Sequence, residues 1–309
     1  MEIVHTSVMV EEALRYLRPD KEDALFLDGT LGEGGHCEAM LSCFPRLRAV
    51  GVDADPVILD RARERLLPFG DRFRGVNAWS DDFLRDYPLN EPPDRILLDL
   101  GISVFHYSRS GRGFSFTAEE PLDMRLSDEG GESAADILAS RDEKTLADIF
   151  FTLGGERYSR RIARGVVRRR AEKHIGSAKE FAEIIWNAVP ASYRHGRIHP
   201  ATRSFQALRI AVNRELERLD RVLPLALDIL PGGGRLGVIA FHSLEDRRVK
   251  TFFREKSRAG VVNLLTRKAA RPGEEERRRN SPSRSARFRA AEKLAAGSGP
   301  GKGGARCPE

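Results

Sequence analysis

The sequence predicts an α/β fold in which a doubly wound parallel sheet is interrupted by a helical domain. Short apolar segments at 24–28, 48–53, 73–77 and 94–100 are separated by helical patterns, the alternation that is typical of a parallel sheet. After the fourth segment the alternation stops. Helical patterns then fill the chain until a strand-like segment returns at 234–241. We therefore expect the helical domain to be inserted after the fourth strand.

The first predicted strand ends in Asp28 and continues into a glycine-rich turn that opens a helix near His36. The glycines of this turn are Gly29, Gly32, Gly34 and Gly35. They do not follow the GxGxxG spacing of a dinucleotide site, and a carboxylate in the turn would repel a pyrophosphate. The same carboxylate would attract the ammonium or sulfonium of S-adenosyl-L-methionine. The turn therefore favours that cofactor over a dinucleotide.

Two further carboxylates stand where predicted strands end, Asp53 after the second strand and Asp99 in the fourth. Ligands of open α/β sheets bind outside the carboxyl ends of the strands, so these acids are expected to line one crevice. Asp53 suits the two ribose hydroxyls of a nucleoside as an acceptor, and free N–H groups near His36 suit a ligand carboxylate. The alternative for Asp99 is a helix cap.

The net charge of the whole chain is +6, and the positive charge is concentrated in its second half. The basic segments are 157–170 and 254–289, a pattern that indicates a polyanion such as RNA or DNA. The alternative is a solvated helix face followed by a disordered tail. In the first segment, four arginines at spacings of three and four are expected on one helical face that could follow phosphates: Arg157, Arg160, Arg161 and Arg164.

The remaining composition is that of a cytoplasmic enzyme. No apolar run reaches the roughly 18 residues needed to span a bilayer, and the first residues form no basic leader. Cys37, Cys43 and Cys307 show no CxxC spacing, so we expect reduced thiols and neither a disulfide nor a metal. The glycine-rich end of the chain, 294–309, is expected to be disordered.

Longer motifs resemble a known family. HPATRSFQALRIAVNRELE at 199–217 and GGRLGVIAFHSLEDRRVKTFF at 233–253 are the most specific of them. Others occur in the same order as in the family, at 5–14, 28–36, 52–56, 96–103, 112–116, 121–125, 154–163 and 283–293. Together they cover nearly the whole chain, which resembles the RsmH or MraW family of 16S ribosomal RNA cytosine-N4 methyltransferases.

This resemblance implies a Rossmann-like class I S-adenosylmethionine-dependent methyltransferase fold with an inserted all-helical domain. The reaction it implies is methyl transfer to N4 of a cytidine in the decoding centre of 16S rRNA, in the small ribosomal subunit. We expect the methyltransferase domain at 1–104 and 211–293, and the helical substrate-recognition domain at 105–210. No membrane contact is expected, and a homodimer is left open.

The resemblance also implies cofactor contacts at matching positions: Gly34, Gly35, His36, Asp53 and Asp99. A family phenylalanine over the adenine corresponds to Trp79, or to Ser80 if the alignment does not slip by one residue. We favour Trp79, because an adenine face needs a flat ring. His106 stands where the family pattern has a glutamine that contacts the cofactor, so the resemblance implies a cofactor contact at His106 as well. His5 is expected to be structural or to cover the cofactor.

The chemistry of an exocyclic amine suggests further roles. The amine lone pair is delocalised into the ring, so an acceptor such as Asp99 or Ser103 must hold its N–H and orient it. A base taken out of folded RNA also needs a flat partner. The candidates are Phe105, Tyr107 and Phe241, the last of which is otherwise plain core. His242 is either a substrate contact or a helix cap, and the loop 112–125 shapes the target pocket or links domains.

The sequence leaves two alternative functions open. A DNA amino-methyltransferase would fit the cofactor, but such enzymes carry an [S/D/N]PPY-type motif after the fourth strand, where this chain has DLGIS. A noncatalytic assembly factor with a vestigial fold would fit the departures from the family pattern at Val104, His106 and Ser108. Cofactor binding without methyl transfer would favour the second rival.

Overall fold

The computed structural model describes residues 6–127 and 130–295 and divides into two compact units. The helical unit is residues 102–217, and the sheet unit is residues 6–101 with 218–295. The breaks therefore fall at 101/102 and 217/218, whereas the sequence predicted them at 104/105 and 210/211. His5, Cys307 and residues 296–309 of the expected disordered end lie outside the described residues.

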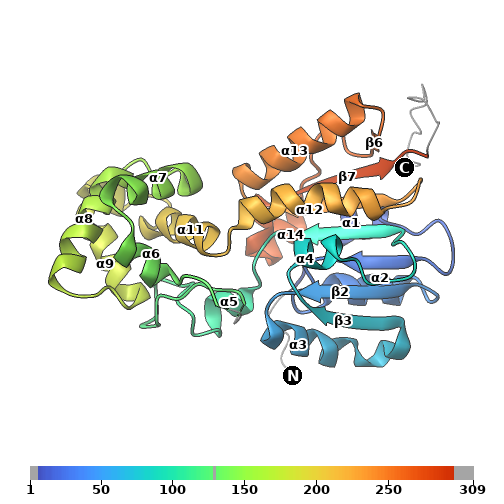
Figure 1. Cartoon of the computed structure of the whole chain (residues 1–309), viewed down its shortest axis with the longest axis horizontal. Coiled ribbons are helices and arrows are strands. Elements are labelled where there is room, and N and C mark those ends of the chain that lie inside the picture. Colours follow the sequence, from blue (N-terminus) through green and yellow to red (C-terminus); the bar gives the residue numbers. More distant parts are fainter. Residues whose placement is uncertain (1–5, 128–129, 296–309) are drawn as a thin grey trace. The chain divides into compact units, whose positions relative to one another are not determined.

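The sheet unit contains a seven-stranded sheet in the order β3-β2-β1-β4-β5-β7-β6 (Figure 1). The five strands predicted from the sequence are present and parallel, and β7 runs antiparallel to both of its neighbours. The strands are β1 (Leu25–Asp28), β2 (Arg48–Asp53), β3 (Phe73–Asn77), β4 (Arg95–Asp99), β5 (Arg235–Ala240), β6 (Val262–Leu264) and β7 (Arg287–Lys293). The 3-2-1-4-5 part is the strand order of a Rossmann-like doubly wound sheet, which confirms the α/β fold class.

The last two strands rule out one alternative. The basic segment 254–289 is not a disordered tail, because it contains β6 and the start of β7. Arg287 and Arg289 lie in β7 and both bind Asp246, at 2.7 Å each. The single carboxylate of Asp246 therefore holds both guanidinium groups, of which Arg289 is buried and Arg287 is partly exposed.

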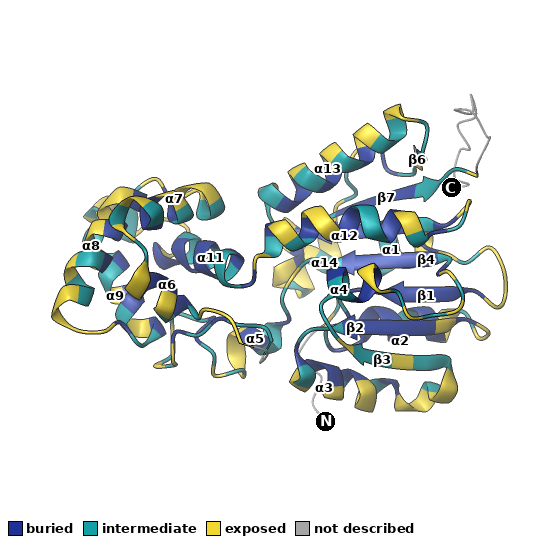
Figure 2. Ribbon diagram, viewed as in Figure 1, coloured by how far each residue is buried: buried dark blue, intermediate teal, exposed yellow. Residues whose placement is uncertain are grey.

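Both faces of the sheet are covered. Leu25 and Leu27 of β1 belong to one apolar cluster, whereas Phe26 between them belongs to another, as expected for a strand buried on two sides. Figure 2 shows β1, β2 and β4 as largely buried. Helices α4 (Ser80–Arg85), α12 (Glu215–Ile229) and α13 (Ser243–Arg258) contribute to the first cluster, and α1 (Val10–Tyr16), α2 (Gly35–Cys43) and α3 (Pro56–Leu66) to the second. The remaining helical segments of this unit are η1 (Leu67–Arg72), α14 (Glu274–Arg279) and η2 (Ser281–Ser285).

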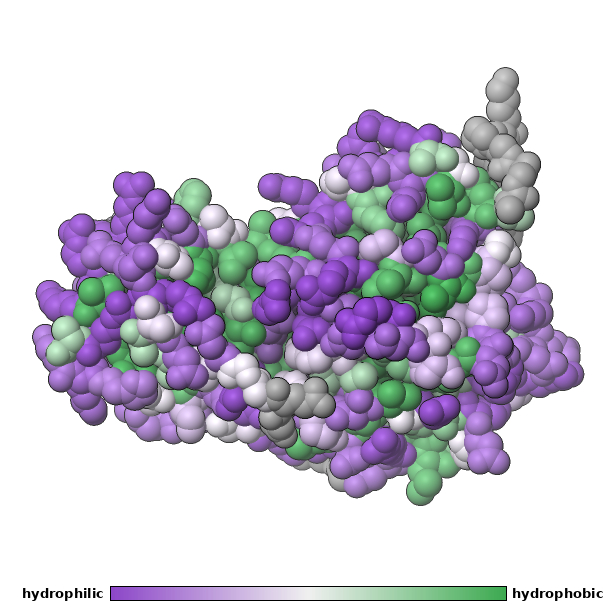
Figure 3. All heavy atoms as spheres, viewed as in Figure 1, coloured by the Kyte–Doolittle hydropathy of each residue, from purple (hydrophilic) through white to green (hydrophobic). Residues whose placement is uncertain are grey.

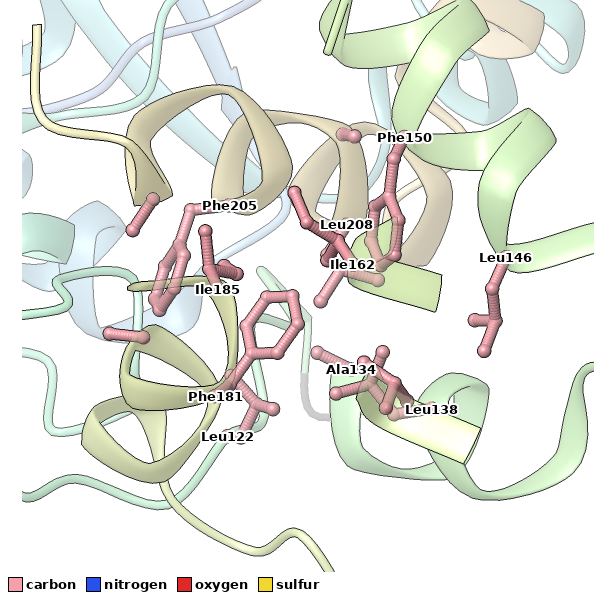
Figure 4. Packing of buried hydrophobic residues seen from close by; sticks show 14 of the residues in the cluster. Leu122, Ala134, Leu138, Leu146, Phe150, Ile162, Phe181, Ile185, Phe205 and Leu208 are labelled. Carbon is pink, nitrogen blue, oxygen red and sulfur yellow. The ribbon is translucent and has the colours of Figure 1, made fainter. Parts of the chain in front are cut away.

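The helical unit has its own core. Its helices are α5 (Val104–Ser108), α6 (Ala134–Ser140), α7 (Glu143–Gly154), α8 (Ser159–Glu172), α9 (Ala178–Ala188), α10 (Ala191–Arg194) and α11 (Ala201–Val212). Phe150 and Phe181 are fully buried and stack with their ring centroids 6.0 Å apart. Figure 4 shows Phe181, Ile162 and Leu208, from three different helices, converging in this cluster. The unit therefore buries an apolar core without help from the sheet.

The surface of both units is mostly hydrophilic on the face seen in Figure 3, with smaller apolar patches between the charged side chains. Within the described residues, no helix combines the length and the apolarity that crossing a membrane requires.

Candidate active site

The glycine turn after β1 is tight on one side and open on the other. The Gly29 N–H donates to the carbonyl oxygen of Leu97 at 2.9 Å, which ties the turn to β4. Gly34 has φ of 80°, in the left-handed region that favours glycine. A Cβ on Gly35 would lie 2.1 Å from Ser7 Oγ, whereas one on Gly32 would meet nothing within 4 Å. The sequence therefore needs small residues where α2 begins, and the turn faces open space at Gly32.

Asp53, at the end of β2, fixes this turn from the neighbouring strand. Its Oδ2 accepts the Gly32 N–H at 2.8 Å and its Oδ1 accepts the Asp55 N–H at 2.9 Å. Asp55 in turn caps α3, where its carboxylate accepts the Val57 N–H at 2.9 Å. The carboxylate predicted to bind a ribose thus lies at the open side of the glycine turn.

Three titratable groups meet where β1 and β4 end. His36 Nε2 is 3.4 Å from Asp99 Oδ2, and the fully buried Asp28 lies nearby. Burial raises the pKa of Asp28 to about 6, against the lowering effect of His36. Burial also lowers the pKa of His36, but the carboxylates of Asp99 and Asp28 outweigh it and raise that pKa overall. The cluster therefore holds a histidine that is easily protonated between two acids.

This cluster leaves polar atoms without partners. Asp99 Oδ1 and His36 Nδ1 are buried and make no hydrogen bond to any residue that the structure describes. Such groups cost free energy unless a ligand satisfies them. A ligand carboxylate would supply an acceptor for a protonated His36, and a ligand N–H would supply a donor for Asp99 Oδ1. His36 therefore fits the carboxylate of S-adenosylmethionine, and Asp99 Oδ1 is open to a donor from a second ligand.

Trp79 lies between the ends of β2 and β1. The preceding Ala78 N–H donates to the Asp53 carbonyl at 3.0 Å, and the following Ser80 hydroxyl donates to the Gly29 carbonyl. The guanidinium of Arg218 covers the indole of Trp79, 3.9 Å from its centroid. The structure thus commits the hydroxyl of Ser80 to the backbone of the turn, and the flat ring of Trp79 lies under the guanidinium of Arg218.

Phe241 and His242 follow β5. Phe241 packs against Gly101, where an added Cβ would lie 2.7 Å from Cε2 of the phenylalanine. His242 caps α13, with Nδ1 accepting the Glu245 N–H at 3.4 Å, and Glu245 reaches back to the Phe241 N–H at 2.9 Å. The cap that was the alternative for His242 is therefore observed, and its role toward a substrate stays a prediction.

Other predicted residues belong to the helical unit. Ser103 caps α5 by accepting the Phe105 N–H at 3.1 Å. His106 is buried, with edge contacts to the rings of Phe105 at 6.0 Å and Phe114 at 5.4 Å. Tyr107 is 45% exposed. The roles of these four side chains toward cofactor or RNA stay predictions.

The prediction that four arginines share one helical face is wrong for one of them. Arg160, Arg161 and Arg164 are exposed on α8, but Arg157 precedes that helix. The buried Glu156 accepts the Tyr158 N–H at 2.8 Å and the Tyr193 hydroxyl at 2.8 Å, which holds this part of the chain in a turn. The guanidinium of Arg157 then lies over the rings of Tyr158 and Tyr193, at 4.9 and 4.6 Å.

Sequence reasoning missed several side chains near these features. Thr30 accepts the Asp99 N–H through Oγ1 at 2.5 Å, and Arg218 covers Trp79. In the helical unit, Thr202 and Gln206 line a cavity together with Arg209. The spacing of these last three residues, four and then three, places them on one helical face and was a usable signal. The contact of Arg218 with Trp79 joins distant parts of the chain and had no local signal.

The Rossmann-like sheet and the acid-lined glycine turn define an S-adenosylmethionine-dependent methyltransferase. The model of the MraW methylase family matches residues 2–294, so the chain belongs to this family. Proteins named ribosomal RNA small subunit methyltransferase H are similar to it. One from Treponema denticola is 54% identical over 95% of this chain and 98% of its own length, and one from Borrelia turicatae is 45% identical over 94% and 98%. The family, fold class and cofactor predicted from the sequence are thereby confirmed.

Proposed function

We propose that this enzyme transfers a methyl group from S-adenosylmethionine to N4 of a cytidine in the decoding centre of 16S rRNA. The names of the relatives support an rRNA of the small subunit as substrate. The cytidine and its position rest on the family resemblance of the motifs. A ribosomal substrate would also place the enzyme in the cytoplasm.

Support for the cofactor site comes from the sheet unit. We assign the ribose to Asp53, the carboxylate to His36 and the first N–H groups of α2, and the adenine to Trp79. Gly34 and Gly35 let the start of that helix pack closely against Leu66 and Ser7, and the turn stays open at Gly32. The bound cofactor supplies a methyl group on a positively charged sulfur, which is electrophilic without any further activation.

Asp99 carries the proposal for the acceptor. Its Oδ1 is buried, faces no donor among the described residues and lies at the carboxyl end of β4. An acceptor there would hold one N–H of the exocyclic amine, so that the nitrogen lone pair is directed at the methyl carbon. The nitrogen–carbon bond forms as the sulfur–carbon bond breaks, and one proton leaves the nitrogen. We infer that Oδ1 takes up that proton.

The helical unit would bind the RNA backbone. Arg160, Arg161 and Arg164 of α8 are exposed. Arg164 has a carboxylate neighbour, Glu143 at 3.6 Å, but both side chains are open to water and such pairs are weak. Guanidinium groups bind phosphate oxygens in a forked geometry, which suits an RNA surface.

The test is methyl transfer from labelled S-adenosylmethionine to small subunits purified from cells that lack this protein. We expect N4-methylated cytidine at one position, identified by mass spectrometry of the digested rRNA. Methylation of another atom or base would contradict the assignment of Asp99. Tight cofactor binding without transfer to subunits, naked RNA or DNA would favour a noncatalytic assembly factor.

A further inference from the structure

A cavity of about 290 Å³ lies in the helical unit, and its lining includes Tyr107 and part of the loop 112–125. Four aromatic side chains line it, namely Tyr107, Phe114, Phe116 and Phe205, and Thr202 and Gln206 add polar groups from α11. The volume is just below the range for small-ligand pockets, about 300–1,000 Å³. The cavity therefore suits one flat ring system of modest size.

The aromatic walls are held in place. The ring of Phe116 stacks on His199, with centroids 4.3 Å apart and planes 10° apart, and meets the edge of Phe205 at 5.5 Å. The Tyr107 hydroxyl accepts a hydrogen bond from Arg209 at 3.0 Å, and Glu215 fixes that guanidinium through two bonds of 2.8 and 2.9 Å. A ligand would thus meet a preformed site rather than one that must be ordered on binding.

The polar side chains of the cavity are available to a ligand. Neither Thr202 nor Gln206 makes a side-chain hydrogen bond to another residue in the part of the chain that is described. A glutamine amide offers an acceptor oxygen and a donor NH₂ side by side. The edge of a nucleobase presents the complementary pair.

The charges around the cavity favour a neutral ligand. The charged side chain at the cavity is Arg209, and Glu215 balances it. A phosphate would lack an unbalanced cation here, and an ammonium would lack a carboxylate. A neutral, flat ring with donors and acceptors on its edge is the chemistry that these walls accept.

We propose that this cavity binds one unpaired nucleobase of the rRNA substrate, stacked on the aromatic walls and hydrogen-bonded to Gln206. The proposal rests on the function proposed above. Single-stranded RNA is recognised in this way, through bases that are splayed out, stacked on aromatic rings and read along their edges.

The first experiment uses the full enzyme with two variants, Gln206→Leu and Phe116→Leu, and the matched control Thr152→Val, an exposed site on α7 that does not line the cavity. Affinity for small subunits and the KM for methyl transfer are measured together with the affinity for S-adenosylhomocysteine. We expect each cavity variant to weaken subunit binding roughly tenfold, the scale of losing one stacked or hydrogen-bonded base, and to leave cofactor affinity unchanged. The control should behave as the wild type.

Ultraviolet crosslinking to the subunit supplies the second readout. The expected product joins a nucleotide to the peptide that contains Phe116 or to the one that contains Tyr107, and attachment to the methylated cytidine or to a neighbour would both support the site. Wild-type KM and subunit affinity in both variants would overturn the proposal, as would crosslinks confined to other peptides. If Gln206→Leu fails to fold, Thr202→Val tests the same wall. Absence of methyl transfer by the wild type would instead contradict the proposed function.

Discussion

The two units place their charged groups in opposite ways. In the sheet unit, Asp28 and His36 are buried, and Asp53 is bound by backbone N–H groups. In the helical unit, Arg160 and Arg164 stand in solvent on α8. Fixed, desolvated charges recognise a small ligand of defined shape, whereas exposed ones suit a polyanion that can shift along them. We therefore expect a substitution in one unit to weaken either cofactor binding or RNA binding, but not both.

The largest expected effect is that of Asp53→Ala on cofactor binding. The change removes two backbone hydrogen bonds to a carboxylate and the proposed ribose contact, so we expect at least roughly 100-fold weaker binding of S-adenosylhomocysteine by calorimetry. The exposed Asp60→Ala, next to α3's Arg63, is the control. RNA affinity should be equal in wild type and Asp53→Ala, and an unchanged cofactor affinity in the variant would contradict the assignment of Asp53.

Asp99→Asn tests the acceptor with little change of shape. The amide keeps one oxygen but loses the charge and the capacity to take a proton, so we expect kcat to fall by roughly 100-fold or more. Subunit affinity, measured by filter binding, should not change. A variant with normal kcat would remove Asp99 from the reaction.

A pH dependence of stability should belong to the sheet unit. The pKa of Asp28 is raised to about 6 in the folded protein, so the native state binds the proton more tightly than the unfolded chain does. Its contribution is therefore fully present below about pH 4 and is lost as pH rises to about 6, by about 1–3 kcal/mol. Urea unfolding of Asp28→Asn should lack this decline between pH 4 and 6. The same decline in the variant would contradict the assignment.

Charge reversal on α8 tests RNA binding by the helical unit. Arg160→Glu with Arg164→Glu should weaken subunit binding roughly tenfold at moderate salt and lower the slope of log affinity against log salt by about 1–2. Cofactor affinity should be that of the wild type. The cation Arg85, exposed on α4 of the sheet unit, gives the control variant Arg85→Glu. A cofactor defect in the α8 variant would show that the units are not independent.

The smallest effect is expected at Arg218. Its guanidinium supports one face of the Trp79 ring, so Arg218→Gln should weaken cofactor binding a fewfold, by about 0.5–1 kcal/mol. Arg221→Gln is the control, because Arg221 shares Asp81 with Arg218, whereas the guanidinium described over the indole is that of Arg218. Trp79 fluorescence in a Trp186→Phe background reports the ring directly. Tighter binding would mean that Arg218 obstructs the adenine.

Sequence reasoning succeeded where the signal was local. Each parallel strand was visible as an apolar run, and the acids Asp28, Asp53 and Asp99 stood at the ends of three of them. These acids do converge, because parallel strands bring their carboxyl ends to one edge.

It failed where distant residues decide the outcome. Strand β7 was hidden because Arg287 and Arg289 look like solvent-exposed charges until Asp246 of α13 binds them. Arg157 fits the helical spacing of α8, but the helix begins only at Ser159. The buried Glu156 bonds to Tyr193 and holds the preceding residues in a turn. The cover of Trp79 by Arg218 and the cavity beside Phe116 likewise depend on tertiary packing that no local pattern reports.

The position of β7 has a consequence for the order in which the protein can fold during synthesis. β7 lies between β5 and β6 and forms the only described strand pairing of β6. The seven-stranded sheet therefore cannot be completed until residues 287–293 have been synthesised. The helical unit is continuous in sequence and finishes at residue 217, so its core can form while the sheet unit still lacks three strands. A nascent chain stopped shortly after α11 should accordingly protect its helical segment from proteases before its first strands.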